Sequence, residues 1–174
     1  RVKPFLLLAS RAEDAAADDE YAAYLRYGGL APEQLRRVRL EAAPLPELDL
    51  AEYSGVIVGG SPFTSSDPAE KKSDTQHRVE GELAVLLDRI VAEDFPFLGA
   101  CYGVGTLGRH QGALIDRTFG EQLGGVEIEL TRPGLASPLL RGIPRRFTTL
   151  PAPTWPAPKL PSHPWRRSVP RPPP

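Results

Sequence analysis

Short apolar runs alternate with amphipathic stretches along most of the chain. Phe5 to Ala9, Gly55 to Gly59 and Phe95 to Ala100 are compact apolar runs, which are typical of strands buried on both faces. Thr75 to Ala92 carries its apolar residues at helical spacing and predicts an amphipathic helix. Further helices are expected at Glu13 to Tyr27 and Tyr102 to Gln111, and further strands at Val38 to Leu40, extending back to Leu35, and at Val126 to Leu130. This alternation predicts an α/β fold with a mostly parallel sheet covered by helices on both faces.

Composition restricts the classes of protein that this chain can represent. Its 174 residues suit one domain, and its 41% hydrophobic and 25% charged residues are ordinary for a globular protein. The longest apolar runs are about five residues, so no membrane segment is expected. A single cysteine excludes an intramolecular disulfide and favours a reducing cytoplasm. The net charge of −1 gives no reason to expect nucleic acid as a partner.

The last part of the chain differs sharply from the rest. All acidic residues lie at or before Glu129, and residues 151–174 contain ten prolines. Proline lacks the amide donor and fixes one backbone torsion, so this segment cannot form a helix or a central strand. The sequence therefore predicts a folded domain over residues 1–147 and a Pro/Arg-rich, extended or disordered tail over residues 148–174.

The segment most suggestive of chemistry follows the apolar run that ends at Ala100. Gly99, Cys101 and Gly103 form a G-x-C-x-G pattern between a predicted strand and a predicted helix, which is the arrangement of a nucleophile elbow. The two glycines let strand and helix backbones approach closely, and the helix N-terminus favours the thiolate form of the cysteine. The alternative is a small buried residue at a strand end, since free cysteines are often buried.

A second glycine pair favours the catalytic interpretation. Gly59 and Gly60 follow the strand at Gly55, and such a pair can turn a backbone amide outward towards a ligand. The amides of Gly60 and Tyr102 would then form an oxyanion hole beside Cys101. An ordinary glycine-rich strand end is the competing interpretation of this pair.

Together these segments resemble the class I glutamine amidotransferases, and most closely the amidotransferase domain of GMP synthase and its stand-alone relatives. The matching segments are G-V-I-V-G-G-S-P-F at 55–63, F-P-F-L-G-A-C-Y-G at 95–103, L-G-R-H-Q-G-A at 107–113 and F-G-E-Q-L-G-G-V-E-I-E-L at 119–130. The resemblance covers roughly residues 4–147.

The resemblance implies a flavodoxin-like three-layer α/β/α sandwich that hydrolyses the side-chain amide of glutamine. Cys101 would form a glutamyl thioester while the amides of Gly60 and Tyr102 hold the oxyanion. The ammonia released passes to a synthetase partner or domain in this family, and some stand-alone relatives cleave γ-glutamyl compounds instead. No cofactor is expected, and no residue spacing indicates a metal site.

Two features of the chain depart from the family pattern. The family often has glutamine four residues after the nucleophile, where this chain has Gly105. The family also completes its triad with an H-x-E pair some 80 to 100 residues after the cysteine, whereas only 73 residues follow Cys101 here. His163 is the only downstream histidine, lies among prolines and has no acid after it.

The two upstream histidines do not supply the missing base. His77 is expected on the solvated face of its helix. His110 lies nine residues after Cys101, about 13 Å along a helix. We therefore expect a packing or surface role for both residues.

Two hypotheses about function follow from the sequence. In the first, the chain is of glutamine amidotransferase type, lacks the C-terminal part of the fold and is inactive or nearly so, with an aberrant ending from about residue 148 that a frameshift in a GC-rich gene would produce. In the second, it is a non-catalytic binding protein on the same scaffold whose basic proline-rich tail holds a partner. A γ-glutamyl hydrolase or cysteine peptidase would share the fold but would need the same base.

Overall fold

A computed structural model describes residues 2–116, 125–149 and 165–167. The chain divides into two compact units, residues 1–115 and residues 116–174, which are described separately below. The boundary predicted from the sequence, near residue 147, lies inside the second of these units. In the part of the chain that the structure describes, no helix is long and apolar enough to cross a bilayer.

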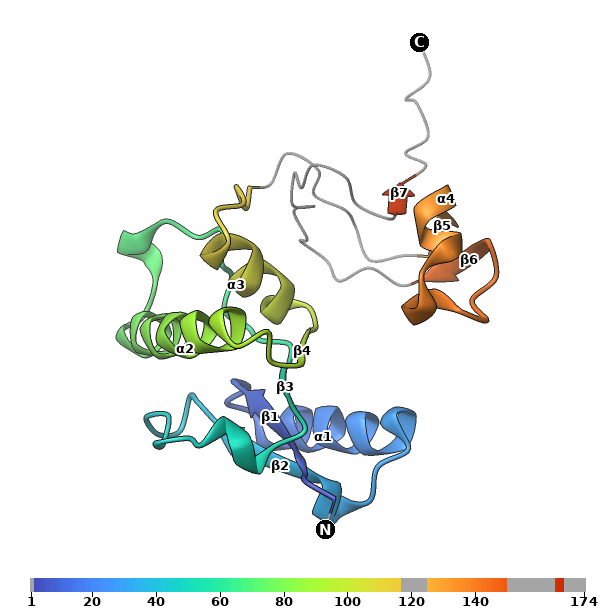
Figure 1. The fold of residues 1–174 in the computed structure, drawn as a ribbon. Coiled ribbons are helices and arrows are strands. Elements are labelled where there is room, and N and C mark those ends of the chain that lie inside the picture. Colours follow the sequence, from blue (N-terminus) through green and yellow to red (C-terminus); the bar gives the residue numbers. More distant parts are fainter. Residues whose placement is uncertain (1, 117–124, 150–164, 168–174) are drawn as a thin grey trace. The chain divides into compact units, whose positions relative to one another are not determined.

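The first unit is built on a four-stranded parallel sheet of order β2-β1-β3-β4 (Figure 1). The strands are β1 (Phe5–Ala9), β2 (Leu35–Arg39), β3 (Gly55–Val58) and β4 (Phe97–Gly99). The α-helices are α1 (Asp14–Gly28), α2 (Asp74–Ala92) and α3 (Tyr102–His110), and short 3-10 helices span Pro32–Gln34, Leu50–Glu52 and Ala69–Lys71. The predicted α/β fold with a parallel sheet is confirmed, and each of these strands and α-helices was expected from the sequence to within a few residues.

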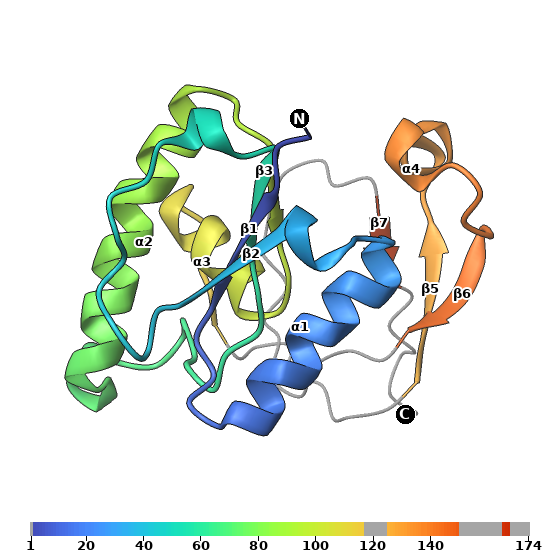
Figure 2. The same ribbon diagram turned by 90° about the horizontal axis from the view of Figure 1, so that it is seen from below.

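Helices cover both faces of this sheet, giving three layers (Figure 2). On one face Leu7 and Ile57 pack with Tyr21 and Tyr24 of α1. On the other face the side chains of Leu6, Leu8, Val56 and Val58 join those of α2 and Tyr102 of α3 in the larger core. The two faces alternate along β1 and β3, which is why both strands are apolar at every position.

Local signals explain where the helices begin and end. Gly29 follows α1 with a positive φ of 62° and its amide bonds back to the Leu25 carbonyl, a left-handed helix end that glycine accommodates easily. The Ser73 side chain accepts the Gln76 amide and begins α2. Along α2 the buried side chains recur at helical spacing and include Val79 and Leu83.

The second unit contains a three-stranded antiparallel sheet of order β6-β5-β7. Its elements are β5 (Val126–Leu130), α4 (Arg132–Ala136), a 3-10 helix at Pro138–Leu140, β6 (Arg146–Thr149) and β7 (Trp165–Arg167). β7 lies within the proline-rich segment, but its three residues include no proline and it is an outer strand rather than the central one. The rest of that segment lies outside the described residues.

Candidate active site

Cys101 sits at a sharp turn between β4 and α3. Its φ and ψ are 53° and −106°, so its backbone occupies a region that L-residues other than glycine rarely adopt. Holding such a conformation costs on the order of 1–3 kcal/mol and is characteristic of functional sites. The residue is exposed and its thiol is not in a disulfide. This is the geometry that a nucleophile elbow requires.

Steric contacts account for the two glycines that flank the turn. A Cβ on Gly99 would lie 2.7 Å from the backbone of Gly103, and a Cβ on Gly103 would lie 2.4 Å from the Val58 carbonyl oxygen. Neither contact can be relieved by a side-chain rotation, because both involve backbone atoms. The predicted role of Gly99 and Gly103 in close strand–helix packing therefore has a direct steric basis in the structure.

Strand register brings the glycine pair after β3 to the same sheet edge as Cys101. Val58 is paired with Gly99, and the Ala100 amide donates to the Val58 carbonyl at 2.9 Å. Gly60 and Cys101 each follow this pair by two residues. Neighbouring strands lie about 4.8 Å apart, so Gly60 begins the loop beside the elbow.

The Gly60 amide is hydrogen-bonded to a carboxylate that the sequence did not indicate. The Gly60 N–H donates to Oε1 of Glu20 on α1 at 2.8 Å. Arg11, in the loop between β1 and α1, donates from Nε to the same oxygen at 3.4 Å. The other oxygen of Glu20, Oε2, is buried and has no hydrogen-bond partner among the described residues.

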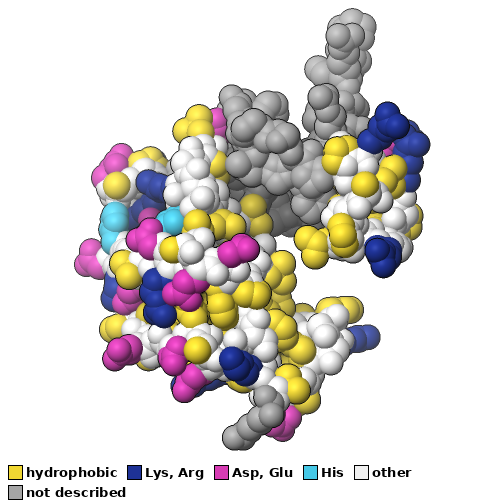
Figure 3. All heavy atoms as spheres, in the orientation of Figure 1, with side chains coloured by type: hydrophobic (Ala, Val, Ile, Leu, Met, Phe, Trp, Pro, Cys, Tyr) yellow, Lys and Arg dark blue, Asp and Glu magenta, His cyan; other side chains and the backbone are white. Residues whose placement is uncertain are grey.

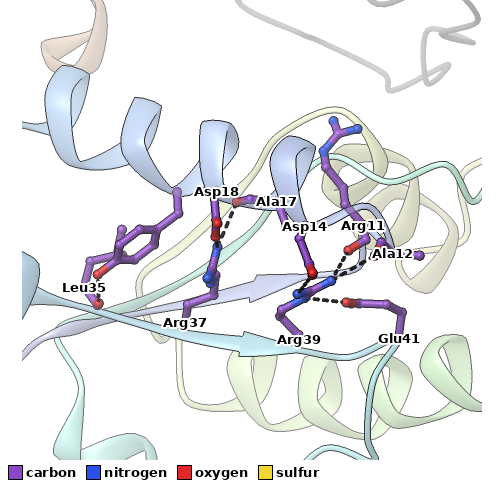
Figure 4. Close-up of polar contacts among 10 residues, drawn as sticks. Arg11, Ala12, Asp14, Ala17, Asp18, Leu35, Arg37, Arg39 and Glu41 are labelled. Carbon is purple, nitrogen blue, oxygen red and sulfur yellow. Dashed lines mark hydrogen bonds and ion pairs between the residues drawn. The ribbon is translucent and has the colours of Figure 1, made fainter.

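The loop that carries Arg11 is fixed by Arg39 on β2 (Figure 4). Arg39 Nη2 donates to the carbonyl oxygens of Arg11 at 2.9 Å and Ala12 at 3.2 Å, and its Nη1 pairs with Asp14. The Arg11 guanidinium points away from this cluster in Figure 4. Its backbone is thus fixed while its side chain reaches Glu20.

Tyr24, which lies on α1 with Glu20, has a hydroxyl whose pKa depends on both Glu20 and Cys101. Burial raises the pKa of Tyr24 to about 12, and the negative charges of Glu20 and of a Cys101 thiolate act in the same direction. Tyr24 is therefore a neutral hydrogen-bond donor at physiological pH. Sequence reasoning did not single out Arg11, Glu20 or Tyr24, because acids and tyrosines on an exposed-looking helix carry no motif.

Tyr102 anchors the start of α3 in the core. Its ring is 4% exposed and packs edge-on against Phe63, with ring centroids 6.1 Å apart. Burial raises the pKa of its hydroxyl. The amides of a first helical turn have no acceptor within the helix, which fits the predicted role of the Tyr102 amide as an anion donor.

The structure explains the glycine at position 105, where the family often has glutamine. A Cβ on Gly105 would lie 3.1 Å from the Ser65 hydroxyl oxygen, so the loop after β3 takes up the space next to it. A side chain there would first meet the Ser65 hydroxyl, which would have to rotate or shift slightly.

The two histidines that the structure describes are bound away from the elbow. His77 on α2 contacts the Ala69 carbonyl at 2.9 Å, and His110 at the end of α3 contacts Asp88 at 2.8 Å. Both line a pocket of about 360 Å³ between α2 and α3 whose lining does not include Cys101. The expected packing or surface role of these histidines agrees with these contacts, and His163 lies outside the described residues.

The described residues show no metal cluster, and one face of the first unit carries charges of both signs. Among the described residues, no group of three or more His, Cys, Asp or Glu side chains is placed to hold a metal ion. On the face shown in Figure 3, acidic and basic side chains are intermingled over the helices of the first unit.

Comparison with solved structures identifies the fold. The chain is similar to a glutamine amidotransferase from Thermotoga maritima (TM-score 0.64, 19% identity), covering 98% of this chain and 65% of that one. It is similar to a glutamine amidotransferase from Methylobacillus flagellatus (0.58, 16%), covering 87% and 59% of the two chains. A third similar structure, from Thermoplasma acidophilum, is described as one of the subunits of GMP synthase (0.58, 15%), with coverage of 88% and 66%.

These likenesses show that the chain has the class I glutamine amidotransferase fold, as the sequence motifs predicted. It spans less than two thirds of the length of each of these proteins. No protein-family model matches the sequence, and no curated protein matches it.

Proposed function

We propose that Cys101 is the nucleophile of a glutamine amidotransferase-type site. The observation that carries the proposal is the backbone of Cys101, whose φ of 53° is maintained by two glycines that cannot carry a Cβ. A thiol exposed on such a turn, at the start of a helix, can attack a carbonyl carbon from the sheet edge. The fold supports glutamine as the substrate class.

The proposed reaction proceeds through a thioester. The Cys101 thiolate adds to the side-chain amide carbon of glutamine, and the carbonyl oxygen becomes an oxyanion held by the amides of Tyr102 and Gly60. Ammonia leaves after gaining a proton, and water then hydrolyses the glutamyl thioester to glutamate. Ammonia would be delivered to a synthetase partner. We place the reaction in a reducing compartment such as the cytoplasm, because reducing conditions keep an exposed thiol from being oxidised.

We further propose that this chain hydrolyses glutamine slowly or not at all. The leaving ammonia needs a proton donor, and the attacking thiol needs a base. His77 and His110 line the pocket between α2 and α3, where they contact Ala69 and Asp88 rather than the thiol. We expect glutamate release at the rate of a buffer blank in a glutaminase assay of the full chain.

Alkylation of Cys101 tests the nucleophile without needing turnover. Iodoacetamide should modify Cys101 faster than it modifies the cysteine of an unstructured peptide at the same pH, because the turn holds the exposed sulfur at the start of α3 as in an activated nucleophile. The rate is followed by intact-mass spectrometry, with the urea-unfolded chain as a matched control. Equal rates for folded chain, unfolded chain and peptide would remove the basis of the proposal.

A non-catalytic binding role is the alternative, supported by the basic composition of residues 130–174, which contain no acid. Deleting residues 148–174, which also removes β7 and the end of β6, separates the two functions when it is compared with the full chain. Loss of a binding partner with unchanged Cys101 reactivity would favour the binding role. If the deleted chain keeps the same binding partners as the full chain, the ending has no function. In that case the gene, translated in its other frames around codon 147, should continue into a strand followed by H-x-E.

A further inference from the structure

The Gly60 amide, a proposed oxyanion donor, already has an anionic partner within the chain. Glu20 Oε1 accepts this N–H at 2.8 Å, a distance typical of a charge-assisted hydrogen bond. The Glu20 side chain is only 12% exposed, although it is charged and belongs to a surface helix. The carboxylate is thus drawn inward, towards the end of β3.

The backbone at the end of β3 is shaped to receive this carboxylate. A Cβ on Gly59 would lie 2.9 Å from Glu20 Oε2, and one on Gly60 would lie 2.5 Å from the Arg11 guanidinium. Side chains at these positions would push the charged pair away. The glycine pair therefore serves Glu20 and Arg11 as well as the turn itself.

One amide hydrogen cannot serve two anions at once. An oxyanion formed on a substrate carbonyl would need the same Gly60 hydrogen that Glu20 accepts, and the two negative oxygens would repel each other at that separation. Either Glu20 leaves when substrate binds, or the oxyanion is held by Tyr102 alone. The state seen in the structure is consequently closed at one of the two donors.

We propose that Glu20 is a positioning residue that closes the oxyanion site through the Gly60 amide, held in place by Arg11, until a substrate carbonyl displaces it. This inference rests on the proposed function of Cys101. Glu20 Oε2 is buried without a hydrogen-bond partner among the described residues, so movement of the carboxylate towards solvent would relieve a desolvation cost. The ligand class that opens the site is a carbonyl compound whose oxygen replaces Glu20 Oε1 on the Gly60 amide.

The electrostatic surroundings of Tyr24 agree with this arrangement. The pKa of its hydroxyl, raised mainly by burial, is raised further by both Glu20 and Cys101, which places one phenol within electrostatic reach of both.

Two alkylating probes test the proposal. In a chloromethyl ketone analogue of glutamine, the Cys101 sulfur displaces chloride while the neighbouring carbonyl oxygen occupies the oxyanion position. Iodoacetamide also gives a thioether, by displacement of iodide, but does not need the oxyanion donors. The ratio of the two rates therefore reports the state of the Gly60 amide and cancels changes in thiol reactivity or in general access.

We expect Glu20→Ala to raise this ratio by about tenfold, the effect of freeing a donor from one charge-assisted hydrogen bond. Glu20→Gln should raise it less, because its amide oxygen still accepts the Gly60 hydrogen. Asp19→Ala is the matched control, since Asp19 is an exposed acid on the same helix. This control should leave the ratio unchanged.

The outcomes distinguish failure of the Glu20 proposal from failure of the proposed role of Cys101 as nucleophile. A ratio unchanged in both Glu20 variants, with rapid iodoacetamide labelling, overturns the closing role and leaves Cys101 as the nucleophile. Iodoacetamide labelling no faster than that of a free peptide overturns the proposed function instead. Partial unfolding of Glu20→Ala would raise both rates together, and the milder Glu20→Gln then decides by its ratio.

Discussion

Cys101 shows how one residue can be held in an unfavourable conformation by its neighbours. Its positive φ is enforced from both sides, because Gly99 lies against Gly103 and Gly103 lies against the Val58 carbonyl. Both contacts are between main chains, so the turn can be relieved only by moving β4 or α3. The side chain at position 101 is consequently presented at the sheet edge whatever its chemistry.

Alanine substitutions at a crowded glycine and at an open one should have opposite effects on stability. Gly103→Ala would insert a Cβ 2.4 Å from a backbone oxygen and should destabilise the chain by about 1–3 kcal/mol. Gly81→Ala on α2 meets nothing within 4 Å and should instead stabilise it by about 1 kcal/mol. Urea unfolding followed by circular dichroism measures both, and a Gly103→Ala variant as stable as the parent would contradict the close packing.

At the scale of elements, the loop between β1 and α1 links the sheet to the candidate site. Arg39 on β2 holds this loop through two carbonyl oxygens and through Asp14, the first residue of α1 (Figure 4). Arg11 in the same loop reaches Glu20. Arg39 does not contact Gly60, but a substitution of Arg39 should loosen Arg11 and thereby weaken the hold of Glu20 on the Gly60 amide.

The Asp14–Arg39 pair predicts a defined dependence on pH. The hydrogen bond from Arg39, reinforced by its positive charge, lowers the pKa of Asp14 below its ordinary value of 3.8. Because the folded-state pKa is lowered, the stabilisation is complete above pH 3.8 and is lost as pH falls through the lower, folded-state value.

Carboxyl NMR titration of Asp14 measures this effect directly. The midpoint should lie below 3.8 in the parent chain and return towards that value in Arg39→Gln. Arg37→Gln is the control and should raise the midpoint less, because Arg37 contributes only a weaker charge interaction. A midpoint that does not move in Arg39→Gln would show that the pair does not form in solution.

At the scale of the whole molecule, β4 is an outer strand of the parallel sheet formed by the described residues. Its central side chain, Leu98, is 56% exposed although the strand is apolar. Outer strands with exposed apolar side chains favour association with other chains. Self-association of this chain would therefore start at the β4 edge, where Leu98 is exposed.

Self-association should depend on Leu98 more than on other exposed apolar residues. Leu98→Lys should shift sedimentation velocity profiles towards monomer at high protein concentration, because charge on an outer strand opposes edge pairing. Leu139→Lys is the control, since Leu139 is 93% exposed but lies in a 3-10 helix of the second unit. Equal effects of both substitutions would indicate general solubility rather than edge pairing.

The strands and helices could be predicted from the sequence because each carries a strong local signal. The apolar runs identify β1 and β3, the glycine pair after α1 ends that helix, and the helical spacing of apolar residues identifies α2. Cys101, Gly99 and Gly103 were also recognisable, because a nucleophile elbow is a contiguous motif whose glycines are needed locally. The segment around β7 was harder, because proline content argues against central strands but not against an outer one.

The sequence by itself determined the parallel α/β architecture and the turn at Cys101, since both follow from local periodicity and from glycine sterics. Only the tertiary structure decided what surrounds that turn. Glu20 and Arg11 lie 40 and 49 residues before Gly60, and nothing in their local sequence distinguishes them from solvated charges. Their meeting with the Gly60 amide depends on α1 packing across β1 and β3, and such a contact between distant segments leaves no local pattern to read.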